Sequence, residues 1–258
     1  MSGRQGDARE PSEAEIWNEL GRLDPYWAVL ARSRVRLGGW LPRLTSFYTT
    51  GVEDVAACMT LTPDADFSQI LDYGSGTGRL SFALAPHAEL VSCVDLSVTM
   101  QDRLRDEATV RQVTNLRFLS PQDPPVPGHT WAISLLTLQH LPGHDGVRDA
   151  LRYIRDSLVP GGFGVIEVPT ATRSVLARVN VTFHPQWRLY RAARRMRIPA
   201  PWLIRHGIHG IYFHVLSASA LTQLMGELGL TVTARSEGET KHYSFVRYGF
   251  VRSTTASP

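Results

Sequence analysis

Apolar runs and segments of helical periodicity alternate between residues 69 and 168. Five short apolar runs predict strands, at 69–74, 90–96, 116–120, 131–140 and 162–168. The segments at 78–87, 98–108 and 144–159 have the spacing of helices, and Pro160 and Gly161 predict the end of the last one. Strands separated by helices of this length are typical of a parallel sheet with helices on both faces.

The sequence on either side of this region has other patterns. Residues 13–30 carry aromatic and aliphatic side chains at helical spacing, interrupted by Pro25, and are expected to cover part of a neighbouring core. The alternation stops after Pro169 and returns near Leu216, so an insertion is expected there. The C-terminal residues predict a helix at 217–230 and then two closing strands, at 231–237 and 243–252, that we expect to form an antiparallel pair.

Composition narrows the class of protein. Of the 258 residues 43% are hydrophobic and 20% charged, and no apolar run approaches the roughly 20 residues that a membrane-spanning helix needs, so no membrane span is expected. The polar first 12 residues are expected to be disordered and lack the apolar core of a secretory signal, which predicts a cytoplasmic location. Cys58 and Cys93 lie in apolar surroundings and are expected to be buried, reduced thiols.

Charge alone does not point to a nucleic-acid partner. The net charge is +3, but the sequence contains neither zinc-finger spacing nor an aromatic RNA-binding signature. No nucleic acid is therefore expected as a partner, and the sequence does not determine an oligomeric state.

A glycine-rich turn follows the strand predicted at 69–74. Gly74, Gly76 and Gly78 occupy alternate positions after Asp72, and glycine lets a ligand approach the backbone closely. A simple strand-to-helix corner needs fewer glycines. The dinucleotide fingerprint needs a glycine where this chain has Arg79, and the Gly-Lys-Ser/Thr of a Walker loop is absent from the sequence here. The turn therefore favours another adenosyl ligand.

These residues resemble motif I of the class I S-adenosylmethionine-dependent methyltransferases, and other segments agree with that family in order and spacing. They are Asp95 at the end of the second strand, FLSPQD at 118–123, SLLTLQHLP at 134–142, LVPGGFGVIEV at 158–168, and, near the N-terminus, LGRLDPYWAVL and FYTTG. The resemblance covers roughly residues 17–168 and 217–250. It implies an α/β, Rossmann-like class I methyltransferase fold, with a seven-stranded, mostly parallel sheet, helices on both faces, an N-terminal helical cover and an inserted helical lid.

The resemblance also implies how the chain is divided. Residues 1–62 are expected to form a disordered tail and a helical cover, and residues 63–169 the S-adenosylmethionine-binding core. Residues 170–216 are expected to form the inserted substrate lid, and residues 217–258 the C-terminal part of the core.

S-adenosylmethionine is the cofactor that the resemblance implies, with S-adenosylhomocysteine as product. Asp95 is expected to accept hydrogen bonds from the ribose hydroxyls, and Gln122 or Asp123 one from the adenine amine. Asp72 is expected to favour the positive end of the cofactor or to cap the turn. The full set expected at the cofactor is Asp72, Gly74, Ser75, Gly76, Gly78, Arg79, Asp95, Leu96, Met100, Gln122, Asp123 and Thr137.

His140 is the candidate catalytic residue, because it follows the fourth predicted strand, where parallel sheets present side chains to a ligand. Its neutral imidazole is a candidate base or acceptor-orienting group, and a buried hydrogen-bonding role is equally consistent with the sequence. His144 lies four residues away, but Pro142 and Gly143 oppose a regular helix there. No further ligand accompanies the pair, so no metal is expected.

The predicted lid has a one-sided charge. From residue 168 to residue 226 there is no Asp or Glu, while eight arginines accumulate. A helix through WRLYRAARRMR places Arg188, Arg191 and Arg195 on one face and Leu189, Ala193 and Met196 on another. Three interpretations stay open: a solvated face paired with carboxylates elsewhere, a guanidinium site for an anionic acceptor, and contact with an acidic membrane surface. The residues expected to bind the acceptor are Tyr26, Trp27, Tyr48, His140, Trp187, Arg191, Arg195 and Tyr212.

The predicted function is methyl transfer to the oxygen or nitrogen of a small, anionic or aromatic biosynthetic intermediate. Two alternatives stay open. The first is a methyltransferase that acts on RNA or protein, although TLQHLP replaces the Asn-Pro-Pro-Tyr type of sequence seen in amino-methylating nucleic-acid enzymes. The second is a non-catalytic protein that binds S-adenosylmethionine or partners another methyltransferase.

Overall fold

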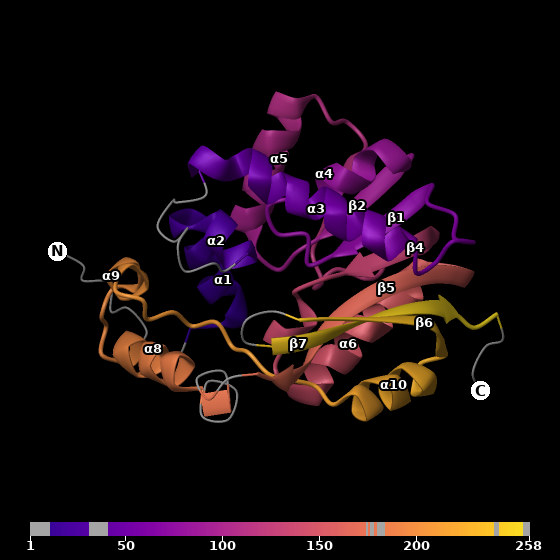
Figure 1. The fold of residues 1–258 in the computed structure, drawn as a ribbon. Coiled ribbons are helices and arrows are strands. Elements are labelled where there is room, and N and C mark those ends of the chain that lie inside the picture. Colours follow the sequence, from indigo (N-terminus) through magenta and orange to yellow (C-terminus); the bar gives the residue numbers. More distant parts are fainter. Residues whose placement is uncertain are drawn as a thin grey trace.

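The computed structural model describes residues 11–30, 41–173, 175, 178–179, 184–239 and 243–254, so that most of the predicted disordered tail lies outside the described residues. Within them, seven strands form one sheet in the order β3-β2-β1-β4-β5-β7-β6 (Figure 1). The strands are β1 (Gln69–Tyr73), β2 (Leu90–Val94), β3 (Leu116–Leu119), β4 (His129–Ser134), β5 (Leu158–Thr172), β6 (Leu230–Glu239) and β7 (Tyr243–Arg252). Only β7 runs antiparallel to its neighbours, β5 and β6. The predicted seven-stranded, mostly parallel sheet is confirmed.

Helices cover both faces of the sheet. On one face lie α3 (Leu44–Met59), α4 (Ser81–Leu84) and α5 (Val98–Arg111), and on the other lie α6 (Gly143–Ser157) and α10 (Ala218–Glu227) (Figure 1). Successive strand residues point to opposite faces, so Ile70 packs toward the first group of helices and Leu71 toward the second. This two-sided burial explains why the strands read as continuous apolar runs.

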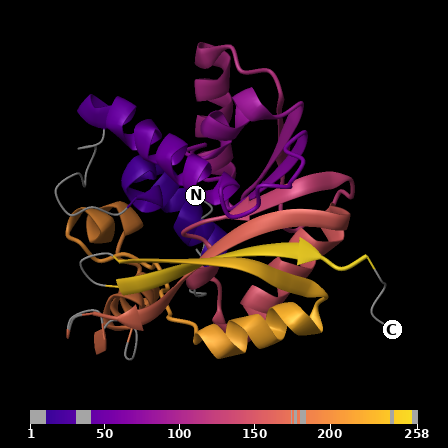
Figure 2. The ribbon, with the colours of Figure 1, turned by 45° about the vertical axis from the view of Figure 1, so that its right-hand side comes forward.

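Four further helices gather at one end of the molecule, and we call them the cap. They are α1 (Glu13–Leu23), α2 (Pro25–Val29), α8 (Pro185–Arg195) and α9 (Ala200–Arg205) (Figures 1 and 2). Ser12 caps α1 in a capping box with Glu15, and Pro25 occupies the first turn of α2, where its missing N–H costs nothing. Ile16, Leu20 and Tyr190 belong to one apolar cluster that joins the N-terminal helices to the inserted ones. The expected helical cover and inserted helices therefore pack against each other.

The boundaries of two predicted elements differ from the structure. The fourth strand ends at Ser134 instead of continuing to His140, because Leu136 adopts a left-handed backbone (φ 59°) that no strand accommodates. β5 begins at Leu158 and runs through the Pro160 and Gly161 that we expected to separate helix from strand. A register shift in the pairing of β4 with β5 follows Leu158, and such an irregularity tolerates proline.

The helix predicted at 78–87 is also shorter than expected. Regular α-helix covers only α4, and a 3-10 turn, η3 (Ala85–His87), follows it because Pro86 cannot donate the next helical hydrogen bond. Two more 3-10 turns are present in the described chain, η2 (Leu41–Arg43) before α3 and η4 (Leu138–His140) after β4. None of the described helices is both long enough and apolar enough to cross a bilayer.

Candidate functional site

The glycine turn after β1 brings the backbone close to the loop after β4. Gly74 and Gly76 have φ angles of +85° and +53°, which side chains rarely adopt. A Cβ added to Gly74 would lie 2.1 Å from Oγ1 of Thr137, so that only glycine lets the two loops approach this closely. The turn therefore offers bare backbone at the carboxyl ends of the parallel strands, where ligands of such sheets bind.

Asp95, at the end of β2, fixes this turn. Its Oδ2 accepts a hydrogen bond of 2.8 Å from the Gly76 N–H, and its Oδ1 accepts one of 2.8 Å from the Ser97 N–H. Burial raises the pKa of the Asp95 carboxyl, and these two N–H donors oppose the shift. A carboxylate has about four acceptor sites, so about two remain for ligand hydroxyls.

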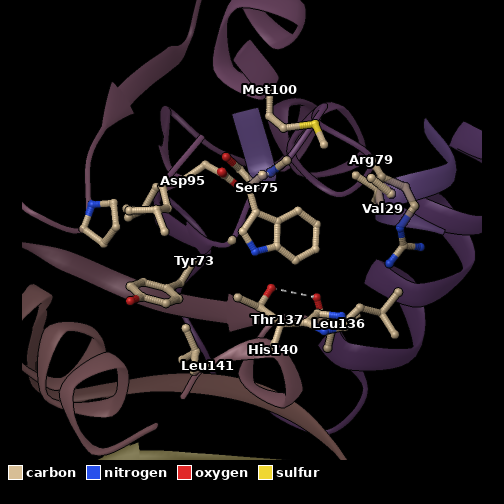
Figure 3. Close-up of a pocket in the computed structure, with 18 of the residues that line it drawn as sticks. Val29, Tyr73, Ser75, Arg79, Asp95, Met100, Leu136, Thr137, His140 and Leu141 are labelled. Atoms are coloured by element: carbon tan, nitrogen blue, oxygen red, sulfur yellow. Dashed lines mark hydrogen bonds between the residues drawn. The ribbon is translucent and has the colours of Figure 1, made fainter. Parts of the chain in front are cut away.

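A cavity of about 300 Å³ lies between these strand ends and the cap (Figure 3). Asp95 and Met100 lie on one side of it, and Thr137, His140 and Leu141 on the other. Of the residues predicted from the sequence, those that line the cavity are Gly74, Ser75, Gly76, Arg79, Asp95, Leu96, Met100, Thr137 and His140. The structure thus brings most of the expected cofactor residues together with the candidate base.

The remaining walls are largely apolar and come from residues that sequence reasoning missed. They are Ala28, Val29, Tyr73, Leu80, Val94, Pro121, Leu135, Leu136, Leu141 and Pro142, with Glu13 and Trp17 from α1. Pro121 is next to the predicted Gln122, and Leu141 and Pro142 follow the predicted His140. The sequence therefore identified the correct loops, but chose neighbouring residues within them. Leu136, in its left-handed conformation, is a strained residue of the kind that clusters at functional sites.

His140 is held in one tautomer. Its Nδ1 lies 2.7 Å from the carbonyl oxygen of Tyr212, which can only accept, so Nδ1 carries the proton and Nε2 keeps the lone pair. Burial lowers the pKa of His140 to about 4, although the Tyr212 carbonyl opposes the shift. The ring packs edge-on against Trp17, with centroids 5.4 Å apart. The cavity therefore has a neutral, oriented imidazole in its wall at pH 7.

Glu13 is the charged residue that the cap adds to the cavity. Burial raises the pKa of its carboxyl, and the positive charge of Arg191 opposes the shift. Glu13 and Trp17 are four residues apart and share one face of α1. The N-terminal segment was expected to cover the core, and its own side chains form part of the cavity wall.

Four residues expected at the cofactor lie away from the cavity wall. Asp72 is buried below the turn, where its Oδ2 accepts a hydrogen bond of 2.6 Å from the Ser81 hydroxyl and burial raises its pKa to about 6. Gly78 faces Leu104 and Phe82 of the neighbouring helices. Gln122 is exposed, and the Asp123 side chain accepts from the Ser120 N–H and closes its own turn.

Most residues expected at the acceptor also lie outside the wall. Tyr26 and Tyr48 are buried in the cap cluster and pack edge-on against Phe47. The Trp27 ring packs against His209. Tyr212 takes part through its backbone carbonyl, which orients His140.

The lid residues Trp187 and Arg191, which were predicted to bind the acceptor, are half-buried in α8. The Arg191 guanidinium lies over the Trp187 ring, 4.7 Å from its centroid, and Arg195 is exposed. Neither these arginines nor Trp187 is among the residues that line the described cavity. The positive charge of Arg191 nevertheless acts on the cavity residue Glu13, because it opposes the rise in the pKa of that carboxyl.

A buried chain of charges supports the cavity from behind. Arg79 donates to Asp54 Oδ2 (2.5 Å), Arg247 donates to Asp54 Oδ1 (2.5 Å), and Arg247 also donates to Glu167 (2.8 Å). The chain links the glycine turn to α3, β7 and β5. Because each charge has an opposite partner, electrostatic attraction offsets the cost of desolvating the buried guanidinium of Arg79.

The described residues contain no group of three or more His, Cys, Asp or Glu side chains arranged to hold a metal ion. Both cysteines are buried and free, and burial raises the pKa of the Cys58 thiol to about 12, so that it is a poor nucleophile. The chemistry of the described site thus depends on the glycine turn, Asp95 and His140.

Comparisons with known proteins agree with this geometry. Residues 70–162 match the family model of a methyltransferase domain. The fold is similar to that of magnesium protoporphyrin IX methyltransferase from Synechocystis PCC 6803 with bound S-adenosylhomocysteine, with a TM-score of 0.62 and 18% identity over 93% of this chain and 97% of that one. It is also similar to N-methyltransferase NodS from Bradyrhizobium japonicum WM9 in complex with S-adenosylhomocysteine, with a TM-score of 0.55 and 16% identity over 91% and 98% of the two chains. A search of the curated proteins gives no match.

The bare backbone of the turn, the spare acceptor sites of Asp95 and the apolar slot beside Met100 fit an adenosyl cofactor with a positive charge. The matched domain includes the turn, Asp95 and His140. Residues 70–162 thus match a methyltransferase domain, and the whole chain has the Rossmann-like fold of class I S-adenosylmethionine-dependent methyltransferases.

Proposed function

We propose that the protein methylates an oxygen or nitrogen atom of a small, mainly apolar or aromatic molecule. The observation that carries the proposal is the division of the cavity. One side offers the glycine turn and Asp95, and the other offers Trp17 and the oriented, neutral ring of His140. A methyl donor and an acceptor therefore have separate, facing walls.

The cofactor side is formed by Gly74, Gly76, Asp95, Leu96 and Met100. When bound, S-adenosylmethionine supplies a methyl group on a positively charged sulfur and leaves as neutral S-adenosylhomocysteine. Asp95 would hold the ribose with its two spare acceptor sites, and Leu96 and Met100 would pack against the base. These contacts position the donor, and positioning supplies much of the rate gain in displacements of this kind.

On the acceptor side, His140 removes the proton that an attacking hydroxyl or amine must lose. Nε2 has the free lone pair, because Nδ1–H is committed to the Tyr212 carbonyl. The acceptor oxygen or nitrogen forms the new bond to carbon, and its proton passes to Nε2. The apolar neighbours Leu141 and Pro142 keep water away from this exchange.

The side chains on the acceptor side of the cavity support one class of acceptor. Trp17 and the ring of His140 offer aromatic contacts, which supports an aromatic acceptor over a sugar or a peptide. The name of one protein of similar fold, a magnesium protoporphyrin IX methyltransferase, also supports a small molecule, and that of another, an N-methyltransferase, supports transfer to nitrogen. The anionic acceptor expected from the lid depends on Arg191 and Arg195, and neither lines the described cavity, so the aromatic acceptor is the better supported one.

Two experiments test the proposal in sequence. Calorimetry should show that the protein binds S-adenosylhomocysteine and that Asp95→Ala lowers this affinity about 100-fold, because two charged hydrogen bonds are lost at about 1.5 kcal/mol or more each. Methyl transfer from radiolabelled S-adenosylmethionine to a panel of phenols and aromatic amines then tests turnover. Binding of S-adenosylhomocysteine without methyl transfer to any acceptor would favour a non-catalytic binding protein. Transfer to RNA or protein alone would favour a macromolecular methyltransferase.

A further inference from the structure

The outer surface of the cap has an unusual charge. The 58 positions from 169 to 226 include eight arginines and no acidic residue, although the whole chain has 24 Asp and Glu. These arginines therefore lack local carboxylates, and their partners have to come from other segments or from outside the molecule.

Three of these arginines have no acidic partner in the part of the chain that the structure describes. Arg188 in α8, Arg197 just after α8 and Arg205 in α9 are exposed, and no described carboxylate lies within ion-pair distance of them. By contrast, Arg79 and Arg247 in the core each contact a carboxylate. The interpretation of the lid as a face paired with distant carboxylates thus finds no support at these three positions.

Large apolar side chains stand among the same arginines. Leu189, Met196 and Trp202 are 50%, 68% and 51% exposed. The sequence placed Leu189, Ala193 and Met196 on one face of this helix, but only Ala193 of the three is buried, together with Tyr190. Six exposed residues of α8, α9 and the segment between them are together called the basic cap surface below: Arg188, Leu189, Met196, Arg197, Trp202 and Arg205.

We propose that the basic cap surface binds the surface of an anionic membrane. The arginines would pair with lipid phosphates, and Trp202, Leu189 and Met196 would enter the boundary between headgroups and acyl chains, where amphipathic helices bind. Tryptophan is favoured at that boundary because its ring is apolar and its N–H is polar. An anionic bilayer offers partners for both kinds of group: phosphates for the arginines and an apolar interior for the bulky side chains.

The position of the surface relates membrane binding to the cavity. Tyr190 of α8 and Leu203 of α9 pack in one cluster with Ile16 of α1, and α1 also carries the cavity residues Glu13 and Trp17. In both ribbon views α8 and α9 lie at the same end of the molecule as α1 (Figures 1 and 2). A membrane bound at this surface would lie against the cap that covers the acceptor side of the cavity.

Flotation of the full-length protein with lipid vesicles tests the proposal. We expect binding to vesicles of phosphatidylcholine and phosphatidylglycerol in equal parts, little binding to pure phosphatidylcholine, and weaker binding as salt is raised. The triple variant Arg188→Gln, Arg197→Gly, Arg205→Gln should lower the partition coefficient roughly 100-fold. Arg197 has a φ of +62°, which glycine favours, so its replacement should not harm the fold. Trp202→Ala should lower binding about 10-fold.

Matched controls on another surface make the test specific. Arg103→Gln with Arg117→Gln removes two exposed arginines, and Val110→Ala shortens a side chain that is 80% exposed, yet both should leave vesicle binding unchanged. Equal melting temperatures would show that all variants are folded. The proposal would be overturned if the natural protein bound neutral and anionic vesicles equally well. It would also be overturned if the control variants lost as much vesicle binding as the triple variant. If double-stranded DNA displaced the vesicles and Trp202→Ala had no effect on vesicle binding, a nucleic-acid partner would be favoured instead.

Discussion

The two sides of the cavity are built in different ways. On the cofactor side, Gly74, Gly76 and Asp95 come from consecutive strand ends within about two dozen residues, and they offer close backbone approach and one carboxylate. On the acceptor side, Trp17 and His140 come from segments more than a hundred residues apart and act through their rings. The comparison shows why the donor is easier to infer than the acceptor: the donor site is local in sequence, and the acceptor site is assembled by packing.

The two sides also differ in how charge is managed. Arg79 at the cofactor side belongs to a chain of alternating charges with Asp54, Arg247 and Glu167. The outer surface of the cap has three arginines without acidic partners in the described chain. The charges behind the cofactor side therefore neutralise one another, whereas those of Arg188, Arg197 and Arg205 have no acidic partner in the described chain.

The largest effect is expected from Gly74→Ala on the cofactor side. The added Cβ would meet Thr137 at 2.1 Å in a backbone with φ +85°, so strain and overpacking should together lower the free energy of unfolding by roughly 4 kcal/mol and abolish S-adenosylhomocysteine binding. Thermal melting and calorimetry measure both. Gly161→Ala is the control, with a similar φ of +79° but an open position, and it should cost only about 1 kcal/mol and leave binding intact. If both variants lost similar stability and binding, the close approach of Gly74 to Thr137 would not be the cause.

The next largest effect is expected from His140→Gln on the acceptor side. Loss of the base should lower kcat about 100-fold, with S-adenosylhomocysteine affinity nearly unchanged, in an assay with an acceptor from the phenol and amine panel. An unchanged kcat would assign His140 to structure alone.

The pH dependence of His140 gives a separate test. Because burial lowers its pKa to about 4 from about 6.5 in an unfolded chain, the ring stays neutral at pH 7 and methyl transfer should weaken only as the pH falls toward about 4. The unfolded chain takes up this proton between pH 6.5 and 4 and the folded chain does not. The stability contributed by the neutral ring is therefore complete above pH 6.5 and lost as the pH falls through that window. Unfolding titrations of His140→Gln should show a smaller acid destabilisation than those of the natural protein.

Trp17→Ala is expected to have a moderate effect confined to the acceptor side. Removal of the ring that packs against His140 should raise the acceptor KM about 10-fold, as truncation of a buried aromatic contact often does. Trp17→Phe should restore most of the loss. Isothermal titration with S-adenosylhomocysteine should give the same affinity for all three proteins, and a parallel loss of cofactor affinity would mean that the two sides are not separate.

The smallest effect is expected from the double variant Arg191→Gln, Arg195→Gln. Neither arginine lines the described cavity, so the acceptor KM should change by no more than about twofold. Loss of the Arg191 charge should raise the pKa of Glu13 further, because that charge opposes the effect of burial. A large increase in KM would instead restore the idea of an arginine site for an anionic acceptor.

Sequence reasoning was accurate where local rules apply. The seven strands and the helices between them follow from apolar periodicity, and the positions of Gly74, Gly76 and Asp95 follow from their places at strand ends. It was wrong about the end of the fourth strand and the start of the fifth. Leu136 takes a left-handed backbone that no residue type signals, and the pairing of Leu158 with His129 extends the fifth strand through a proline.

The acceptor residues were harder to predict because aromatic side chains serve cores and cavities alike. Trp17 lies in α1, and Tyr26 and Trp27 lie in α2. The sequence does not separate the latter two, which are buried in the cap, from Trp17, which reaches the cavity. The same limit applies to α8, where Leu189 and Tyr190 are neighbours with opposite exposure.

The sequence by itself determined the class of sheet, the glycine turn and the carboxylate that fixes it, because these depend on spacing within short segments of chain. The tertiary structure alone decided which side chains face the cavity, which tautomer His140 holds and which arginines have no acidic partner among the described residues. Those properties depend on contacts between distant segments, such as the Tyr212 carbonyl beside His140, and spacing along the chain carries no record of them.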